Sequence, residues 1–279
     1  MRDLIVLSSL VLCFATTFSQ VQNVYEVYAI EYARGLWSVP VSKVAVGAES
    51  KDSVNFSYFV WYLKGDNGRR ILVDVGFLQD TSKPMKSIGH YERPDLALQR
   101  LHVNADDVTD VIITHPHSDH IDGLDLFKKA TIWMQKNDFA YFVGDAWQKD
   151  ASHMGLDKQD VPKIIQANLD GRLRLVNGDS IEIIPGIRAF IGSKHTYESQ
   201  HLLVDSKTKK VLLASDDSWF YYNLDHLLPV PSTFDAQAYV KQLRRMKTLV
   251  TDTQWIIPGH DPLVISRFKQ VSKRIVRIN

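Results

Sequence analysis

The chain has 279 residues, of which 45% are hydrophobic, and its 33 basic and 32 acidic residues leave a formal net charge of +1. This length and hydrophobic content suffice for one large core, so a single α/β domain is expected. The balanced charge excludes a strong whole-chain field toward nucleic acid or an anionic membrane, and it favours a small-molecule substrate.

The first 19 residues have the layout of a secretory signal peptide. A basic residue precedes the apolar stretch Leu4–Ala15, and the small residues Thr17 and Ser19 fit the two pocket positions before a cleavage site. The apolar stretch is shorter than the ~18–20 residues that cross a bilayer, so a membrane anchor is the less favoured alternative. We expect a mature domain that spans residues 20–279 and is secreted or periplasmic, without stable membrane insertion.

The single cysteine, Cys13, lies inside that signal segment. The mature protein is therefore expected to contain no cysteine, which excludes disulfides, a thiol nucleophile and thiolate metal ligands. Histidine and carboxylate side chains have to hold any metal ion in the mature protein.

Strands are expected first, in an antiparallel arrangement, because three segments rich in Val, Ile, Tyr and Phe are bounded by turn residues: Val24–Tyr32, Val54–Leu63 and Arg70–Val75. From Pro94 onward, helices alternate with short strands. The predicted helices are Asp95–His102, Ile121–Lys129 and Ala236–Leu249. The predicted later strands are Val111–Thr114, Thr131–Met134, Leu173–Val176, Ile181–Ile184, Ile187–Ile191, Leu202–Val204, Val211–Ala214 and Trp255–Ile257. The segment Asn137–Asn168 predicts two helical pieces around Gly155, in a place suited to an insertion over an active site.

A dense group of metal-binding residue types follows the predicted strand Val111–Thr114. His115, His117, Asp119 and His120 fall within six positions. A loop that leaves a strand turns alternate side chains toward one point, so the first two histidines can share a metal ion while Asp119 and His120 reach a neighbouring one. Neutral imidazole and carboxylate suit zinc. The alternative is a histidine-rich surface turn.

Other His and Asp residues stand at or just beyond the ends of apolar strands: Asp74, His195, Asp216 and His260. In an α/β sheet such positions gather at one edge, where ligands usually bind. The other five histidines match no motif and are expected to be structural or exposed: His90, His102, His153, His201 and His226. Of these, His153 belongs to the possible lid formed by the insertion.

In order and rough spacing, these residues resemble the five successive motifs of the metallo-β-lactamase superfamily. The resemblance covers nearly all of the mature chain, and it implies an αββα four-layer sandwich with two zinc ions at its edge. Seven side chains would be the ligands: His115, His117 and His195 for one zinc ion, Asp119, His120 and His260 for the other, and Asp216 for both. Asp74 would orient a ligand through a hydrogen bond.

Within the superfamily, the chain looks most similar to the N-acyl homoserine lactonases. An aspartate that bridges the metals, here Asp216, is absent from the β-lactamases but shared by glyoxalase II and these lactonases, and the stretch Lys194–Gln200 is lactonase-like. The chain departs from the lactonases at Trp219, where they carry a tyrosine whose hydroxyl donates to the substrate carbonyl. The indole N–H of Trp219 is also a donor, and Tyr221 or Tyr222 can supply a hydroxyl from nearby; plain packing is the alternative for Trp219.

The expected function is hydrolysis of a lactone or related ester by a metal-bound hydroxide, with Asp119 passing the proton and Trp219 and Tyr222 binding substrate. A thioester hydrolase of the glyoxalase II type is one alternative. A persulfide dioxygenase-like oxidoreductase is another, and it would use a single iron held by His115, His195 and Asp216. A non-catalytic protein on this fold would have lost ligands, and none of the seven is missing.

Overall fold

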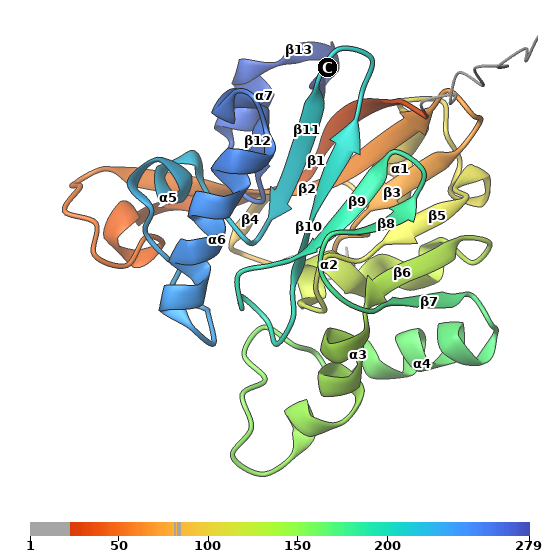
Figure 1. Cartoon of the computed structure of the whole chain (residues 1–279), viewed down its shortest axis with the longest axis horizontal. Coiled ribbons are helices and arrows are strands. Elements are labelled where there is room, and N and C mark those ends of the chain that lie inside the picture. The colour runs from red at the N-terminus through yellow and green to blue at the C-terminus, as the bar shows by residue number, and fades with distance from the viewer. Residues whose placement is uncertain (1–22, 81, 83–84) are drawn as a thin grey trace, which may run out of the picture.

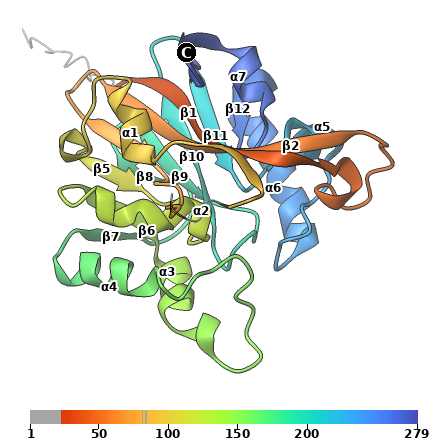
Figure 2. The same ribbon diagram turned by 180° about the vertical axis from the view of Figure 1, so that it is seen from behind.

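The computed structural model of the chain describes residues 23–80, 82 and 85–279. Two β-sheets pack face to face, and helices cover the outer face of each sheet (Figures 1 and 2). The predicted αββα sandwich is therefore confirmed. The expected signal segment, residues 1–19, lies outside the described residues.

The first sheet has nine strands within the described part of the chain. In spatial order they are β13 (Lys269–Ser272), β14 (Ile275–Arg277), β1 (Tyr25–Pro40), β2 (Ser53–Gly65), β3 (Arg70–Val73), β5 (Asp110–Ile112), β6 (Thr131–Gln135) and β7 (Leu173–Val176), with β4 (Ile88–Tyr91) paired to β1. The pairs β1–β2 and β2–β3 are antiparallel as predicted, whereas β3, β5, β6 and β7 run parallel. The loops that follow β3 and β5 therefore leave the sheet at the same edge.

The second sheet runs in the order β12 (Ile256–Pro258), β11 (Lys210–Ser215), β10 (Gln200–Asp205), β9 (Ile187–Ile191) and β8 (Ile181–Ile184). Strands β11 and β12 are parallel, and β10 is antiparallel to both β9 and β11. Strands β9, β11 and β12 thus point the same way. Because of this, the loops after these three strands also meet at one edge.

The helices are α1 (Pro94–Gln99), α2 (Ser118–Ile121), α3 (Lys136–Val143), α4 (Val161–Leu169), α5 (Tyr221–His226), α6 (Ala236–Leu249) and α7 (Leu263–Arg267). Helix α6 has the predicted bounds, since the Asp235 side chain caps it by accepting from two backbone N–H groups at 2.9 Å. Its buried residues Tyr239, Leu243 and Met246 recur at helical spacing and pack on the second sheet. Helices α1, α3 and α4 cover the first sheet in the same way.

Three predicted elements need correction. The helix expected over Asp95–His102 is α1, which ends three residues earlier, at Gln99. Strand β1 continues to Pro40, eight residues beyond the predicted end, because it pairs along its length with β2 in a projecting arm (Figure 1). The predicted helix Ile121–Lys129 is wrong: the short helix α2 ends at Ile121, and Asp122–Leu126 is a 3₁₀ turn. Gly123 lies so close to Val75 that an added Cβ would be 2.2 Å from the Val75 carbonyl oxygen, so a larger residue does not fit at this turn.

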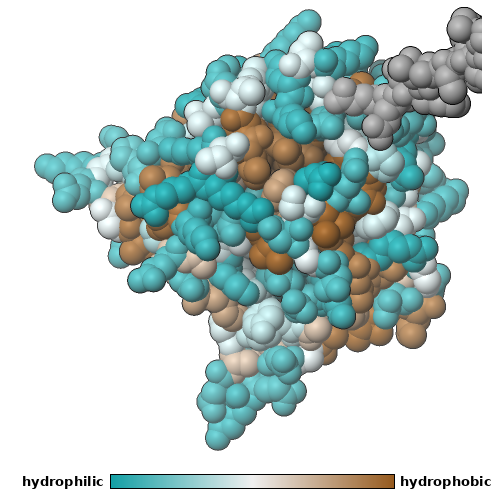
Figure 3. All heavy atoms as spheres, viewed as in Figure 1, coloured by the Kyte–Doolittle hydropathy of each residue, from teal (hydrophilic) through white to brown (hydrophobic). Residues whose placement is uncertain are grey.

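Among the described residues, no helix is both long enough and apolar enough to cross a bilayer. Polar side chains cover most of the face in Figure 3, with smaller hydrophobic areas between them.

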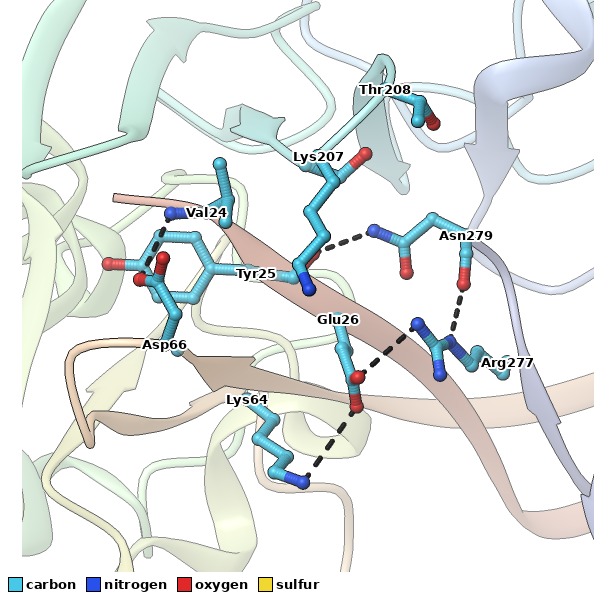
Figure 4. A pocket seen from close by; sticks show the side chains of 11 residues that line it. Val24, Tyr25, Glu26, Lys64, Asp66, Lys207, Thr208, Arg277 and Asn279 are labelled. Carbon is cyan, nitrogen blue, oxygen red and sulfur yellow. Dashed lines mark hydrogen bonds and ion pairs between the residues drawn. The ribbon is translucent and has the colours of Figure 1, made fainter. Parts of the chain in front are cut away.

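A pocket of about 280 Å³ opens between the start of β1 and the end of β2 (Figure 4), where Lys64 and Arg277 flank Glu26. It lies at the sheet edge opposite the loops that follow β3, β5 and β11.

Candidate metal centre

The predicted ligands come together at the edge where the strand-end loops meet. Asp74 follows β3, the stretch that starts at His115 follows β5, His195 follows β9, Asp216 follows β11 and His260 follows β12. Two clusters of possible metal ligands lie there, and together they contain all seven side chains that the sequence predicted.

In the first cluster, three imidazole nitrogens converge. Nδ1 of His117 lies 3.1 Å from Nε2 of His115 and 3.0 Å from Nε2 of His195. Oδ2 of Asp216 is 3.8 Å from the His115 nitrogen and 3.2 Å from the His195 nitrogen. Ligand atoms around a four-coordinate zinc ion lie about 3.3 Å apart, so these four buried side chains fit one such ion.

In the second cluster, two imidazoles face two carboxylates. Nε2 of His120 lies 3.4 Å from Oδ2 of Asp119, and Nε2 of His260 lies 3.6 Å from the same oxygen. Oδ1 of Asp216 lies 3.4 Å from the His120 nitrogen and 3.0 Å from the His260 nitrogen. Nε2 of His260 also lies 3.2 Å from Oδ2 of Asp216, so this carboxylate lies between the two clusters.

In two of the histidines, the ring nitrogen that faces away from the clusters donates to a backbone carbonyl. Nδ1 of His195 donates to the carbonyl oxygen of Ser232 at 2.6 Å, and Nδ1 of His260 donates to the carbonyl oxygen of Ser57 at 2.9 Å. A proton held on Nδ1 leaves the Nε2 lone pair free toward the cluster. These bonds keep both imidazoles oriented as ligands.

Asp74 gathers donors from three parts of the chain. Its Oδ1 accepts from the Thr114 backbone N–H, and its Oδ2 accepts from the Thr114 hydroxyl, from Nδ1 of His120 and from the Ser215 hydroxyl, all within 2.8–3.2 Å. Asp74 is fully buried and adopts a left-handed backbone with φ 58°. The residue thus orients His120 and fastens the ends of β3, β5 and β11 together.

Two atoms at the centre have no hydrogen bond among the described residues: Nε2 of His120 and Oδ1 of Asp216, both buried. An unpaired buried polar atom is costly, and one cation between these two atoms would satisfy both. The imidazole and carboxylate donors also suit zinc. The residues present therefore fit a dinuclear metal site.

The electrostatics keep His115, His117 and Asp216 in their ligand forms, whereas the carboxylates around His120 and His260 raise the pKa values of these two imidazoles. Burial lowers the pKa of His117 to about 3, with help from neighbouring His195, and burial also holds the pKa of His115 well below its usual range. Burial alone would raise the pKa of Asp216, but His260 and His120 outweigh it and hold that pKa well below its usual range. At neutral pH the first two imidazoles are neutral and Asp216 is ionised.

A second buried carboxylate anchors the loop that carries His195. Oδ1 of Asp217 accepts from the Ser193 N–H, the Ser193 hydroxyl and the Ser199 hydroxyl, at 3.0, 2.7 and 2.8 Å. His201 donates to its other oxygen at 2.9 Å. His201 is buried in this contact, as expected for a structural histidine. These hydrogen bonds hold both ends of the loop that carries His195 against the second sheet.

The insertion packs directly against the first cluster. Its helices α3 and α4 confirm the two predicted pieces, but the chain around Gly155 is not helical. The Gly155 carbonyl accepts from the Ser118 N–H at 3.1 Å, and an added Cβ on Gly155 would lie 2.7 Å from the His117 ring. His153 contacts Trp147, with 5.8 Å between ring centroids, within the insertion itself.

The three aromatic side chains expected near the substrate have other partners in the structure. The Trp219 indole N–H donates to Oδ2 of Asp216 at 2.6 Å, so this donor already has a partner. Tyr221 is buried, with Arg267 lying over its ring. The Tyr222 ring stacks on His226 at 3.9 Å, and the structure gives it no contact with the two clusters within the described residues.

Sequence reasoning missed Tyr58, on β2. Its ring lies edge-on to His260, with centroids 5.3 Å apart, and burial, together with the charges of Asp119 and Asp216, raises the pKa of its hydroxyl. It also lines a pocket of about 480 Å³ beside Asp119. An aromatic residue in a strand normally predicts core packing, so the sequence offered no sign of this position.

Comparison with known proteins places these features in a family. Residues 52–260 match the model described as the metallo-beta-lactamase superfamily. An N-acyl homoserine lactonase of Bacillus cereus is 26% identical over 81% of this chain and 92% of its own length. Another, from Bacillus sp., is 26% identical, and the match spans 59% of this chain and 60% of that relative.

Solved structures show the same fold. A mutant of Bacillus thuringiensis AiiA with N-decanoyl-L-homoserine bound at its active site has a TM-score of 0.69 at 20% identity, covering 89% of this chain and 98% of that one. AidC, described as a dizinc quorum-quenching lactonase, has a TM-score of 0.64 at 14% identity, covering 86% and 92%.

Proposed function

The chain belongs to the metallo-beta-lactamase superfamily, and from this premise we propose that it is a dizinc hydrolase that opens a lactone or a related ester. The observation that carries the proposal is the position of Asp216, whose Oδ2 faces His195 while its Oδ1 faces His260. The lactonase relatives support the substrate class.

The proposed ligands are His115, His117 and His195 for one zinc ion, Asp119, His120 and His260 for the other, and Asp216 for both. When bound, two zinc ions supply Lewis-acid chemistry, since they polarise a carbonyl oxygen and lower the pKa of water toward ~7. The reaction then needs no serine or cysteine nucleophile.

Asp119 is the group that moves the proton. Its side chain is 24% exposed, whereas the other proposed ligands are buried. Burial would raise its pKa, but His120 and His260 outweigh burial and hold the pKa at about 2, so the carboxylate is ionised at neutral pH. It accepts the proton of the attacking water as the water oxygen bonds to the carbonyl carbon. It returns that proton to the ring oxygen as the carbon–oxygen bond breaks.

The pocket beside Asp119 is mostly polar, and one part of its wall is apolar. Its volume of about 480 Å³ is ample for a small ligand. Phe77, Leu78, Met85 and Ile88 form an apolar part of its wall, and Asp122, Asp157 and Gln159 form a polar part. We therefore place the acyl chain in this pocket and the ester carbonyl at its inner end.

A substrate panel on the zinc-loaded protein tests the proposal. N-acyl homoserine lactones, simple esters, thioesters and β-lactams are compared, and we expect lactones or esters to be hydrolysed fastest. Chelation should abolish the activity and zinc should restore it. Hydrolysis in oxygen-18 water should place one label in the acid product in a single turnover, because water attacks directly.

Other outcomes have distinct meanings. A strong preference for thioesters would move the assignment to a hydrolase of the glyoxalase II type. One iron per chain, with oxygen consumed, would indicate the dioxygenase alternative. A trapped acyl-enzyme, or no cleavage of any lactone, ester or thioester, would end the proposal.

A further inference from the structure

Tyr58 is held rigidly at the mouth of the site. Besides the edge-on contact with His260, its ring meets Phe77 at 5.4 Å and an interplanar angle of 90°. Phe56 and Tyr32 contact it at 6.4 Å each. Because rings pack against it from several sides, the side chain has little freedom to leave this orientation.

The Tyr58 hydroxyl is an unused donor. Across the described residues no hydrogen bond involves it, whereas the nearby Tyr32 hydroxyl donates to the Asp119 carbonyl and accepts from the Phe77 N–H, each at 3.1 Å. Tyr58 nevertheless lines the pocket together with Asp119. A phenol hydroxyl donates one hydrogen bond and also accepts, so this group can donate to water or to a ligand that occupies the pocket.

The aromatic donors that the sequence suggested have other partners. The Trp219 N–H donates to Asp216. Tyr221 packs against Arg267, and Tyr222 packs against His226. Ser87, Ser118 and Gln159 are further neutral donors in this wall, and Tyr58 differs from them because its ring is packed edge-on against the ligand candidate His260.

We propose that Tyr58 is a catalytic residue whose hydroxyl donates a hydrogen bond to the carbonyl oxygen of the substrate as that oxygen becomes an oxyanion. This inference rests on the proposed function. Tyr58 transfers no proton: water oxygen bonds to the carbonyl carbon, the carbon–oxygen ester bond breaks, and the proton reaches the leaving oxygen through Asp119. The hydroxyl only stabilises the charge that develops.

Tyr58→Phe tests the proposal, because it removes the hydroxyl and keeps the ring. We expect kcat to fall about 100-fold with a small change in KM, as for other single oxyanion donors. Zinc content and melting temperature should stay at the wild-type values. Tyr62→Phe is the matched control: it removes a hydroxyl from the same strand face, about 13 Å farther along β2. Its kcat should be unchanged.

A pair of substrates identifies the oxygen that Tyr58 contacts. If the hydroxyl stabilises the oxyanion, Tyr58→Phe lowers the rate of hydrolysis of an alkyl ester and of a nitrophenyl ester of the same acid by similar factors. A loss confined to the alkyl ester, whose leaving group is poor, would place the hydroxyl at the leaving oxygen and overturn the assignment.

Binding gives a readout that does not depend on turnover. In zinc-loaded protein labelled with ¹³C at the tyrosine ζ carbon, the Tyr58 signal is the one missing from Tyr58→Phe. We expect this signal to shift when N-hexanoyl-L-homoserine is added, because the substrate carbonyl oxygen becomes a carboxylate oxygen of this product. An active wild-type enzyme with an unmoved Tyr58 signal, or with unchanged kcat in Tyr58→Phe, would refute the Tyr58 proposal alone. An inactive zinc-loaded wild type would refute the proposed function.

Discussion

Nδ1 of His120 donates to Oδ2 of Asp74 across 2.8 Å, which joins the end of β3 to the second ligand cluster. The opposite nitrogen of the same imidazole, Nε2, faces Asp119 and Asp216. A carboxylate that is not itself a ligand thus sets which nitrogen of His120 is available to a metal.

Asp74→Asn should weaken zinc binding at the second cluster about 10- to 100-fold. Donors approach both oxygens of Asp74, so either orientation of the amide places an N–H against one of them. Asparagine tolerates the left-handed backbone, which separates this effect from strain. Zinc content against a competing chelator measures it. Asp235→Asn, at the cap of α6, is the control and should keep its zinc. Equal zinc retention in both variants would contradict the prediction.

Asp216→Asn should lose zinc from both clusters, since Asp216 lies within 3.2 Å of the His195 nitrogen of one cluster and the His260 nitrogen of the other. His117→Ala should mainly empty the first cluster. Elemental analysis is expected to give about two zinc ions per chain for wild type and fewer than one for Asp216→Asn. If Asp216→Asn kept two zinc ions, Asp216 would not be the bridging ligand.

Gly259→Ala should disturb the site without touching any ligand chemically. An added Cβ would lie 2.6 Å from Oδ1 of Asp216 and 2.8 Å from the Ser215 backbone, so one of them has to move. We expect a loss of about 1–3 kcal/mol in the free energy of unfolding, together with reduced zinc content. Gly35→Ala, whose Cβ would meet its nearest neighbour at 3.4 Å, serves as the control. The free energy of unfolding is measured by denaturant titration and the zinc content by elemental analysis, on both variants. Equal values for the two variants would contradict the prediction.

The buried Asp138 should make stability depend on pH. Burial raises its pKa to about 7, although hydrogen bonds from Thr196 and Glu198 oppose the rise. The unfolded carboxyl ionises near pH 4, so between about pH 4 and 7 the folded state binds more protons and its stability falls as pH rises. Relative to Asp138→Asn, which stays neutral, wild type should lose about 2 kcal/mol between pH 5 and pH 7. Urea unfolding of both proteins at the two pH values is the measurement, and parallel curves would contradict it.

We also propose export with removal of residues 1–19, on the strength of the short apolar stretch Leu4–Ala15. Intact mass of protein from an exporting host should correspond to a chain that begins near Gln20. A membrane-embedded chain that still carries Met1 would refute this.

The sequence by itself determined the fold class and the seven side chains that cluster at the sheet edge. Residues such as His115 and Asp216 stand out because side chains that can bind metal follow closely after apolar strands. Parallel strands end at one edge of a sheet, so these side chains meet there. Helix α6 was also predictable to the residue, since a cap and a regular apolar face are local features.

Only the tertiary structure decided which atoms face each other. The division of Asp216 between two clusters, the bond from Trp219 to Asp216, and the free hydroxyl of Tyr58 beside His260 all join residues that are distant in sequence or depend on side-chain orientation. A local pattern cannot report these, because a tyrosine in a strand has the same pattern whether it meets the core or a pocket. Packing between the two sheets and their loops sets the difference.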